Sequence, residues 1–123
     1  MARPRFQFLY DHSVAVAGRA GKSSVYWRLL SANNRELGRS AGTFPDLDSC
    51  VAAVRELVDG IGSAAPSISS VRERTGTWSW RLTLGERAVA TAGRPYLRHR
   101  ECTYNLAHFL AAVPDALAAS KQP

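Results

Sequence analysis

The chain has 123 residues, 46% hydrophobic and 21% charged, a balance that excludes a disordered or fibrous protein and fits one globular domain. Sixteen basic and ten acidic residues give a formal net charge of +6. No stretch approaches the roughly 18 to 20 apolar residues that span a bilayer, and the apolar run at residues 6–10 is too short for a secretory signal. We therefore expect a single domain over residues 1–123, cytoplasmic and without a membrane partner.

The most informative feature is an internal repeat. The segment VYWRLL at residues 25–30 recurs as WSWRLT at residues 78–83. The corresponding pairs are Trp27 and Trp80 at a spacing of 53 residues, then Phe44 and Tyr96, and Cys50 and Cys102, at a spacing of 52. The sequence thus predicts two copies of one unit, residues 4–61 and 67–118, joined by the linker 62–66 and sharing one core.

Three strands are expected in the first copy, at residues 5–10, 25–31 and 36–41. A long loop at residues 12–24 joins the first two, and a tight turn at Asn33 and Asn34 joins the next two, because Asn tolerates a positive φ. In the second strand, period-two alternation predicts an inward and an outward set. The inward set is Val25, Trp27 and Leu29, and the outward set is Tyr26, Arg28 and Leu30.

A helix follows in each copy. The first is expected to begin with Asp46 or Asp48 as its N-cap and to stop at Gly60. The second copy repeats the order, with strands at residues 67–74, 77–83 and 87–92 and a helix from about 99 to 118. We expect Pro114 to end or kink this second helix.

This order predicts an α+β fold in which tandem β-β-β-α repeats form a largely antiparallel sheet with two helices packed on one face. The expected state is a monomer with an intrachain pseudo-two-fold axis, while exposed sheet edges leave a homodimer open. Cys50 and Cys102 fall on apolar helical faces, so we expect buried free thiols rather than a disulfide.

The repeat resembles that of the YegP-like family, a group of small bacterial and archaeal proteins. In the first copy the resemblance lies in Trp27, Arg28, Leu29, Asn33, Asn34, Leu37, Ser40 and Phe44, and in the second in Trp78, Trp80, Arg81, Leu82, Val89, Tyr96 and Cys102. The chain departs from the family at Asn34, which replaces a turn glycine, at the shortened turn of Gly85 and Glu86, and in the insertion at residues 15–24. The resemblance implies a sheet of tandem repeats with two helices and no established activity.

No motif predicts catalysis. The GRAGKS segment at residues 18–23 has Val16 where a phosphate-binding loop needs glycine, and a strand rather than a helix is expected after it. His12, His99 and His108 have no Cys or carboxylate at metal-ligand spacing. We expect no metal, no cofactor and no enzymatic activity; an enzyme assembled from distant segments would instead need a deep pocket that holds His12 or His99 beside a carboxylate.

The tryptophans Trp27, Trp78 and Trp80 share the inward parity, which favours a core role over a stacking platform. Arg28, Arg81 and Tyr26 have the outward parity. Two arginines at related positions would suit phosphates or an acidic partner; alternatively each covers the sheet with its stem and pairs with Glu36, Glu86 or a cross-strand neighbour.

The two helix starts differ in charge. Asp46 and Asp48 of the first copy correspond to Arg98 and Arg100 of the second, where Arg94 and His99 also lie. Cations at a helix N-terminus are unfavourable by a few tenths of a kcal/mol each, a cost that a bound anion would remove. We hypothesise an anion contact there; the alternative is a solvated basic patch without function.

The sequence as a whole predicts a non-enzymatic binding module. Its protein or anionic partner would contact the outward sheet face or the basic helix start. The alternative is weak, sequence-tolerant binding of nucleic acid or phosphate through an arginine-rich patch. The salt dependence of binding distinguishes the two. A complex held by phosphate contacts weakens steeply as ionic strength rises, whereas a protein interface should weaken little.

Overall fold

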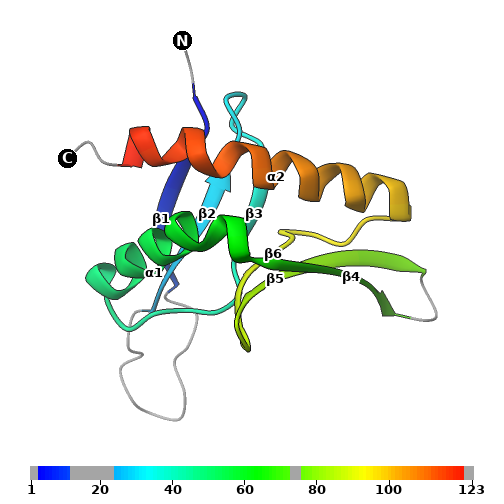
Figure 1. Ribbon diagram of the computed structural model, residues 1–123, viewed down its shortest axis with the longest axis horizontal. Helices are drawn as coiled ribbons and strands as arrows, with labels where there is room; N and C mark the ends of the chain where they lie inside the picture. The colour runs from blue at the N-terminus through cyan, green and yellow to red at the C-terminus, as the bar shows by residue number, and fades with distance from the viewer. Residues whose placement is uncertain (1–2, 12–23, 73–75, 121–123) are drawn as a thin grey trace.

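The computed structural model describes residues 3–11, 24–72 and 76–120. Its elements follow the order strand–strand–strand–helix twice (Figure 1). In chain order they are β1 (Arg5–Asp11), β2 (Ser24–Leu30), β3 (Glu36–Ser40), α1 (Leu47–Gly60), the 3₁₀ turn η1 (Ile61–Ser63), β4 (Ala65–Arg72), β5 (Thr77–Leu84), β6 (Arg87–Thr91) and α2 (His99–Ser120).

The strands form one six-stranded sheet in the order β1-β2-β3-β6-β5-β4, and every neighbouring pair is antiparallel. Both helices cover the same face of this sheet (Figure 1). Helix α2 contacts β1, β2, β3 and β5, whereas α1 contacts β2 and α2. The predicted α+β class, with two helices on one face of an antiparallel sheet, is confirmed. We call the opposite side of the sheet the open face.

The buried side chains of both halves form one hydrophobic cluster. Phe109 of α2 lies at its centre, with its ring centroid 6.3 Å from that of Trp27 and 4.8 Å from that of Trp80. Gly38 of β3 permits this approach, because a Cβ atom there would lie 2.7 Å from Phe109 Cδ2 and 2.8 Å from Trp80. The prediction that Trp27 and Trp80 belong to the core is confirmed, since both are almost fully buried.

Two isolated bridges occupy corresponding places in the halves. The backbone N–H of Val25 donates to the Phe44 carbonyl at 2.8 Å, and the Phe44 N–H donates back at 2.7 Å. Trp78 and Tyr96 exchange the same two bonds at 2.7 Å each. Each bridge pairs a residue of the second strand in its half with a residue just before the helix. The segment that leads into the helix is therefore attached to the sheet in the same way in both halves.

Local signals placed the turns and the first cap correctly. Asn34 has a φ of 63° and Gly85, in the other hairpin turn, also has a φ of 63°. The Asp46 side chain accepts a hydrogen bond from the Ser49 N–H at 2.7 Å, which makes Asp46 rather than Asp48 the N-cap of α1. This hydrogen bond lowers the pKa of the Asp46 carboxyl, because it favours the charged form.

The expected outward position of Leu30 is wrong, because its side chain is only 3% exposed. The β2–β3 ladder shifts register between Leu29, which lies opposite Gly38, and Leu30, which lies opposite Glu36. Such a bulge interrupts strict alternation, so two successive leucines are both buried.

Two further boundaries differ from expectation. Pro114 does not end α2, which continues to Ser120; Val113 and Ala116 on either side of it are fully buried, and this packing offsets the missing backbone donor. Ala65 and Pro66, expected in the linker, belong to β4, where proline is tolerated because β4 is an edge strand.

Several expectations lie outside the described residues, among them the GRAGKS segment, His12 and the end of the strand expected to reach residue 74. Within the described part of the chain, Cys50 and Cys102 are buried free thiols, as predicted. Burial raises the pKa of the Cys50 thiol to about 11. None of the helices described is long and apolar enough to cross a membrane.

Candidate anion-binding surfaces

One row of polar side chains crosses the whole open face. Cross-strand partners in antiparallel pairs share a face, so successive register pairs define the row. From β1 to β4 its members are Gln7, Arg28, Arg39, Thr91, Arg81 and Ser67. We call this set the arginine row. The row lies opposite the helices, because the neighbours Leu29 and Leu82 are fully buried in the core.

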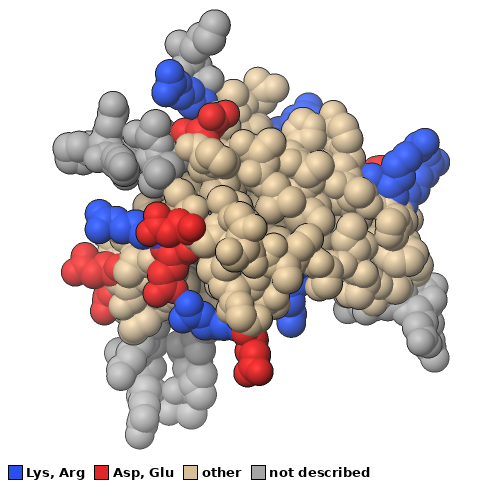
Figure 2. Space-filling view, in the orientation of Figure 1, with Lys and Arg blue, Asp and Glu red and all other residues tan. Residues whose placement is uncertain are grey.

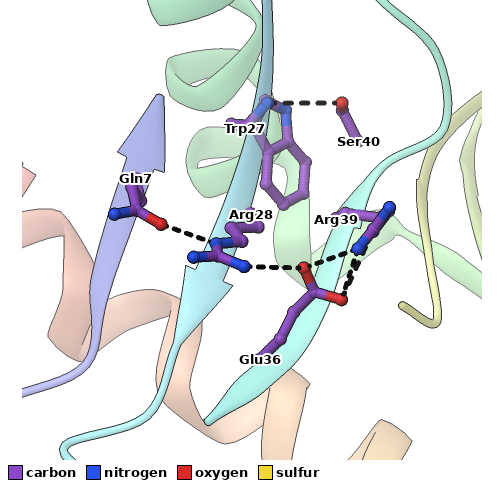
Figure 3. A network of polar contacts seen from close by, with 6 residues as sticks. All are labelled: Gln7, Trp27, Arg28, Glu36, Arg39 and Ser40. Atoms are coloured by element: carbon purple, nitrogen blue, oxygen red, sulfur yellow. Dashed lines mark hydrogen bonds and ion pairs between the residues drawn. The ribbon is translucent and has the colours of Figure 1, made fainter. Parts of the chain in front are cut away.

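Glu36 joins two arginines of the row (Figure 3). The Arg39 Nη2 donates to both carboxylate oxygens of Glu36 at 2.9 Å. The Arg28 Nη1 lies 3.8 Å from Glu36 Oε1, and the Arg28 Nε donates to Gln7 Oε1 at 2.6 Å. Since Arg28 and Arg39 are directly opposite each other, Glu36 offsets a repulsion between like charges. The expected pairing of Arg28 with Glu36 is confirmed.

The backbone after β6 also presses on this carboxylate. A Cβ atom at Gly93 would overlap the Glu36 carboxylate, so a larger residue there would require the Glu36 side chain to move. The Glu36 side chain thus lies among Arg28, Arg39 and the backbone at Gly93, and it is only 18% exposed. It is the counter-charge that Arg28 and Arg39 share on the open face.

Arg81 occupies the place in the second half that Arg28 has in the first, yet its surroundings differ. Its strand neighbours are Thr91 and Ser67, and its side chain is exposed. Among the described residues no acidic side chain lies within ion-pair distance of Arg81, and Glu86 does not pair with it. Arg81 is thus the arginine of the row that has no counter-charge within the described part of the chain.

The start of α2 carries four exposed residues, Arg94, Arg98, His99 and Arg100, which we call the basic helix start. Figure 2 shows Lys and Arg side chains gathered at the end of the molecule where α2 begins. Three of the four have partners. The Arg94 guanidinium lies 5.1 Å from the Tyr96 ring centroid, the Arg98 Nε lies 3.8 Å from Glu101 Oε1, and the His99 ring stands edge-on to Trp78 at 4.9 Å. Among these partners only Glu101 carries an opposite charge, whereas Tyr96 and Trp78 make aromatic contacts.

A shallow pocket of about 340 Å³ opens at one end of the sheet, beside the arginine row. We call it the tyrosine pocket. It is lined by Tyr10 and Asp11 from β1, Tyr26 from β2, Arg39 and Ser40 from β3, and Gly42 and Thr43 just beyond β3. Tyr26 was a candidate from the sequence, and the structure places its ring 5.8 Å from the Arg39 guanidinium carbon.

Sequence reasoning missed Arg39 and Tyr10. A signal for Arg39 existed, because a hairpin folded about Asn33 and Asn34 places residue 39 opposite residue 28. Tyr10 gave no such signal, since its parity with Phe6 and Phe8 favoured burial, yet it is 53% exposed.

The structure does not bring together the two sets of candidates by any contact it describes: Arg28, Arg81 and Tyr26 lie on the sheet, whereas the other four lie at the basic helix start. Within residues 3–11, 24–72 and 76–120, no three His, Cys, Asp or Glu side chains gather as a metal site. No family model, curated protein or solved structure matches the chain. The resemblance to the YegP-like family stays a prediction.

Proposed function

We propose that the protein is a non-enzymatic binding module whose open sheet face binds an anionic partner. The observation that supports this proposal is the arginine row, in which three arginines share one face of the sheet and Glu36, paired with Arg28 and Arg39, is the one acid in an ion pair with any of them among the described residues. The local formal charge of the row with Glu36 is therefore +2. Guanidinium groups suit this role because their planar donors match carboxylate and phosphate oxygens.

The geometry of the row favours an extended anion. Neighbouring strands lie about 4.8 Å apart, so Arg39 and Arg81, which are two strands apart, stand about 10 Å from each other. Nε and Nη2 of Arg39 donate to Glu36, and the Arg39 Nη1 donates no hydrogen bond to the described residues. A chain of phosphates or carboxylates running across the strands would meet these groups in succession.

The basic helix start is the second candidate surface. Its support is the guanidinium of Arg100, which has no ion-pair or hydrogen-bond partner among the described residues, and the helix dipole of α2, which favours negative charge at this end. Because Glu101, Tyr96 and Trp78 already engage its other members, we rank it below the arginine row.

We also infer that the two halves are copies of one unit. The inference is supported by the mirrored strand order, by the repeated order of elements and by the two bridges at corresponding positions. On this view Arg28 and Arg81 descend from one ancestral arginine, and the row formed when two units joined along β3 and β6.

The first prediction tests the row with a short abasic oligodeoxynucleotide, which presents phosphodiesters and no bases. Three phosphate contacts would give a salt slope of about −2, so affinity should fall about 20-fold between 50 mM and 200 mM salt. Arg81→Ala should weaken binding several-fold at low salt and make the slope shallower by about 0.7. Fluorescence anisotropy would measure both quantities.

Arg55→Ala provides the matched control. Arg55 is an exposed residue of α1, so its loss changes net charge equally but should leave affinity almost unchanged. Equal weakening by both variants would mean that overall charge rather than the row drives binding. A loss confined to Arg100→Ala would transfer the function to the basic helix start, and no binding at low salt would contradict the proposal.

A further inference from the structure

Three serines surround Arg81 on the open face of the sheet. Ser67 of β4 lies directly across the ladder from Arg81 of β5, and the next pair on the same face is Ser69 opposite Ser79. These four residues lie on the side away from the helices, because Trp80, between Ser79 and Arg81, is buried in the core. We call Ser67, Ser69, Ser79 and Arg81 the serine cluster.

The hydroxyl groups of the serine cluster are available as donors. None of the three serines makes a side-chain hydrogen bond to the residues that the structure describes, and two of them are exposed. The neighbouring threonines differ, because the Thr83 hydroxyl donates to the Ala65 carbonyl at 3.4 Å and the Thr91 hydroxyl donates to the Trp80 carbonyl at 3.1 Å. A hydroxyl has one proton to donate, so these threonines have none left for a ligand.

The corresponding place in the first half is closed. Its four positions hold Gln7 opposite Arg28 and Leu9 opposite Tyr26. The Arg28 Nε donates to Gln7 Oε1 at 2.6 Å, and the Arg28 Nη1 lies 3.8 Å from Glu36 Oε1. Larger side chains thus cover the sheet there, and the arginine has an acidic partner. The serine cluster has small hydroxyl side chains at the same positions, and its arginine has no counter-charge among the described residues.

The dimensions of the serine cluster fit one tetrahedral anion. Side chains directly across an antiparallel ladder have Cβ atoms about 5 Å apart, and alternate residues of one strand are about 7 Å apart. The four side chains therefore mark a rectangle whose centre is about 4 Å from each Cβ atom. An anion above this centre lies within hydrogen-bond reach of three hydroxyls, and the long Arg81 side chain reaches it from the fourth corner.

The serine cluster also lies where the arginine row ends. Arg81 and Ser67 are the last members of the row, and β4 is an edge strand of the sheet. An anionic chain that follows the row from β2 towards β4 therefore reaches its end at this place. A terminal phosphomonoester presents three free oxygens and a charge of about −2 at neutral pH, whereas a phosphodiester within a chain presents two free oxygens and one charge.

We propose that the serine cluster binds the terminal phosphate of an extended anion whose other phosphates lie along the arginine row. This inference rests on the proposed function and names the end group that sets the position of the ligand on the sheet. Three hydroxyls match the three free oxygens of the phosphomonoester, and the guanidinium of Arg81 balances part of its charge.

The second prediction compares two abasic oligodeoxynucleotides of equal length, one with a terminal phosphate and one without. The wild-type protein should bind the phosphorylated probe about tenfold more tightly, an effect of the order of one hydrogen bond to a charged group. The triple variant Ser67→Ala/Ser69→Ala/Ser79→Ala should lose this preference and keep its affinity for the unphosphorylated probe almost unchanged. Fluorescence anisotropy measures these affinities, with the phosphate placed at each end of the strand in turn.

Thr83→Val is the matched control. Its hydroxyl lies on the same strand but already donates to the backbone, so this variant should retain the preference. A preference that persists in the triple variant would mean that the additional charge of the probe, rather than the serines, causes it, and would overturn the site. If circular dichroism shows that the triple variant is unfolded, the exposed pair Ser67→Ala/Ser69→Ala provides the same test.

The outcomes also separate the two proposals. Equal affinity of the wild-type protein for both probes, at either end of the strand, would overturn the terminal-phosphate site. The proposed function would still stand if Arg81→Ala weakened binding of both probes. Failure of both probes to bind at low salt would overturn both proposals.

Discussion

Two tryptophans at corresponding positions have different hydrogen-bonding environments. The Trp80 Nε1 donates to Asn105 Oδ1 of α2, whereas the buried Trp27 Nε1 has no acceptor among the described residues. The sequence correspondence of 52 residues explains the difference, because Asn105 of the second half aligns with Ala53 of the first. A buried unpaired donor costs about 1–3 kcal/mol, so Trp27 lacks a favourable contact that Trp80 has.

The third prediction therefore concerns Ala53→Asn. If the halves are copies, the new amide should accept from Trp27 Nε1 and contribute about 1 kcal/mol, offsetting the helix-propensity cost of about 0.7 kcal/mol. Ala52→Asn is the matched control, since this neighbouring residue is exposed and pays the propensity cost alone. Urea unfolding should find Ala53→Asn more stable than Ala52→Asn by about 1 kcal/mol. Equal stability would argue against the correspondence.

At the scale of elements, the first three strands are joined by one polar network as well as by their ladders. Glu36 of β3 holds Arg39 of its own strand and Arg28 of β2, and Arg28 reaches Gln7 of β1. The same acid also lowers the positive charge of the open face. Glu36 therefore favours cohesion of the strands but would oppose the anion binding that we propose.

The fourth prediction follows from that opposition. Glu36→Gln should lower the free energy of unfolding by about 1 kcal/mol, because two arginines then stand opposite each other without a counter-charge. The same change should tighten binding of the abasic oligodeoxynucleotide about threefold, since the local charge rises from +2 to +3. Stability and affinity are measured by urea unfolding and anisotropy on one preparation.

Glu56→Gln serves as the comparison. Glu56 pairs with Arg87 at an exposed site, so its loss should change stability by less than about 0.5 kcal/mol and leave binding unaffected. Weaker binding by Glu36→Gln would contradict the prediction. It would mean that Glu36 favours binding by positioning the arginines more than its negative charge opposes binding.

Most elements were predictable, because their signals are local. Alternation located the strands, Asn34 marked a turn, and Asp46 marked a helix start. The errors lie where neighbouring elements override local preference. The register shift between β2 and β3 leaves Leu30 buried. Packing against the core allows α2 to continue past Pro114. Neither effect is visible to a pattern that considers one segment at a time.

At the scale of the whole molecule, α2 is shared by both halves. It contacts β1, β2 and β3 of the first half as well as β5 of the second, and its Phe109 packs against Trp27 and Trp80 together. The strands β3 and β6 continue the sheet from one half to the other. The first half by itself would expose Trp27 and a free sheet edge.

The fifth prediction is that a fragment of residues 1–63 does not fold as a monomer. It lacks Phe109 and the strand that pairs with β3, and it is near the length at which a single core becomes marginal. Circular dichroism and Trp27 fluorescence should report an unfolded chain, while the full chain unfolds in one cooperative transition. A stable monomeric fragment would show that the halves have separate cores.

The sequence by itself determined the fold class, the order of the elements and the inward side of the tryptophan strands, because hydrophobic period and turn chemistry act within a few residues. It also provided the candidates Arg28, Arg81 and Tyr26. Only the tertiary structure decided that Arg39 completes a row with Arg28 and Arg81, that Glu36 pairs with two of these three arginines, and that Tyr26 and Arg39 line one pocket. Those arrangements depend on the register between strands that are distant in the chain, and packing across the whole sheet sets that register.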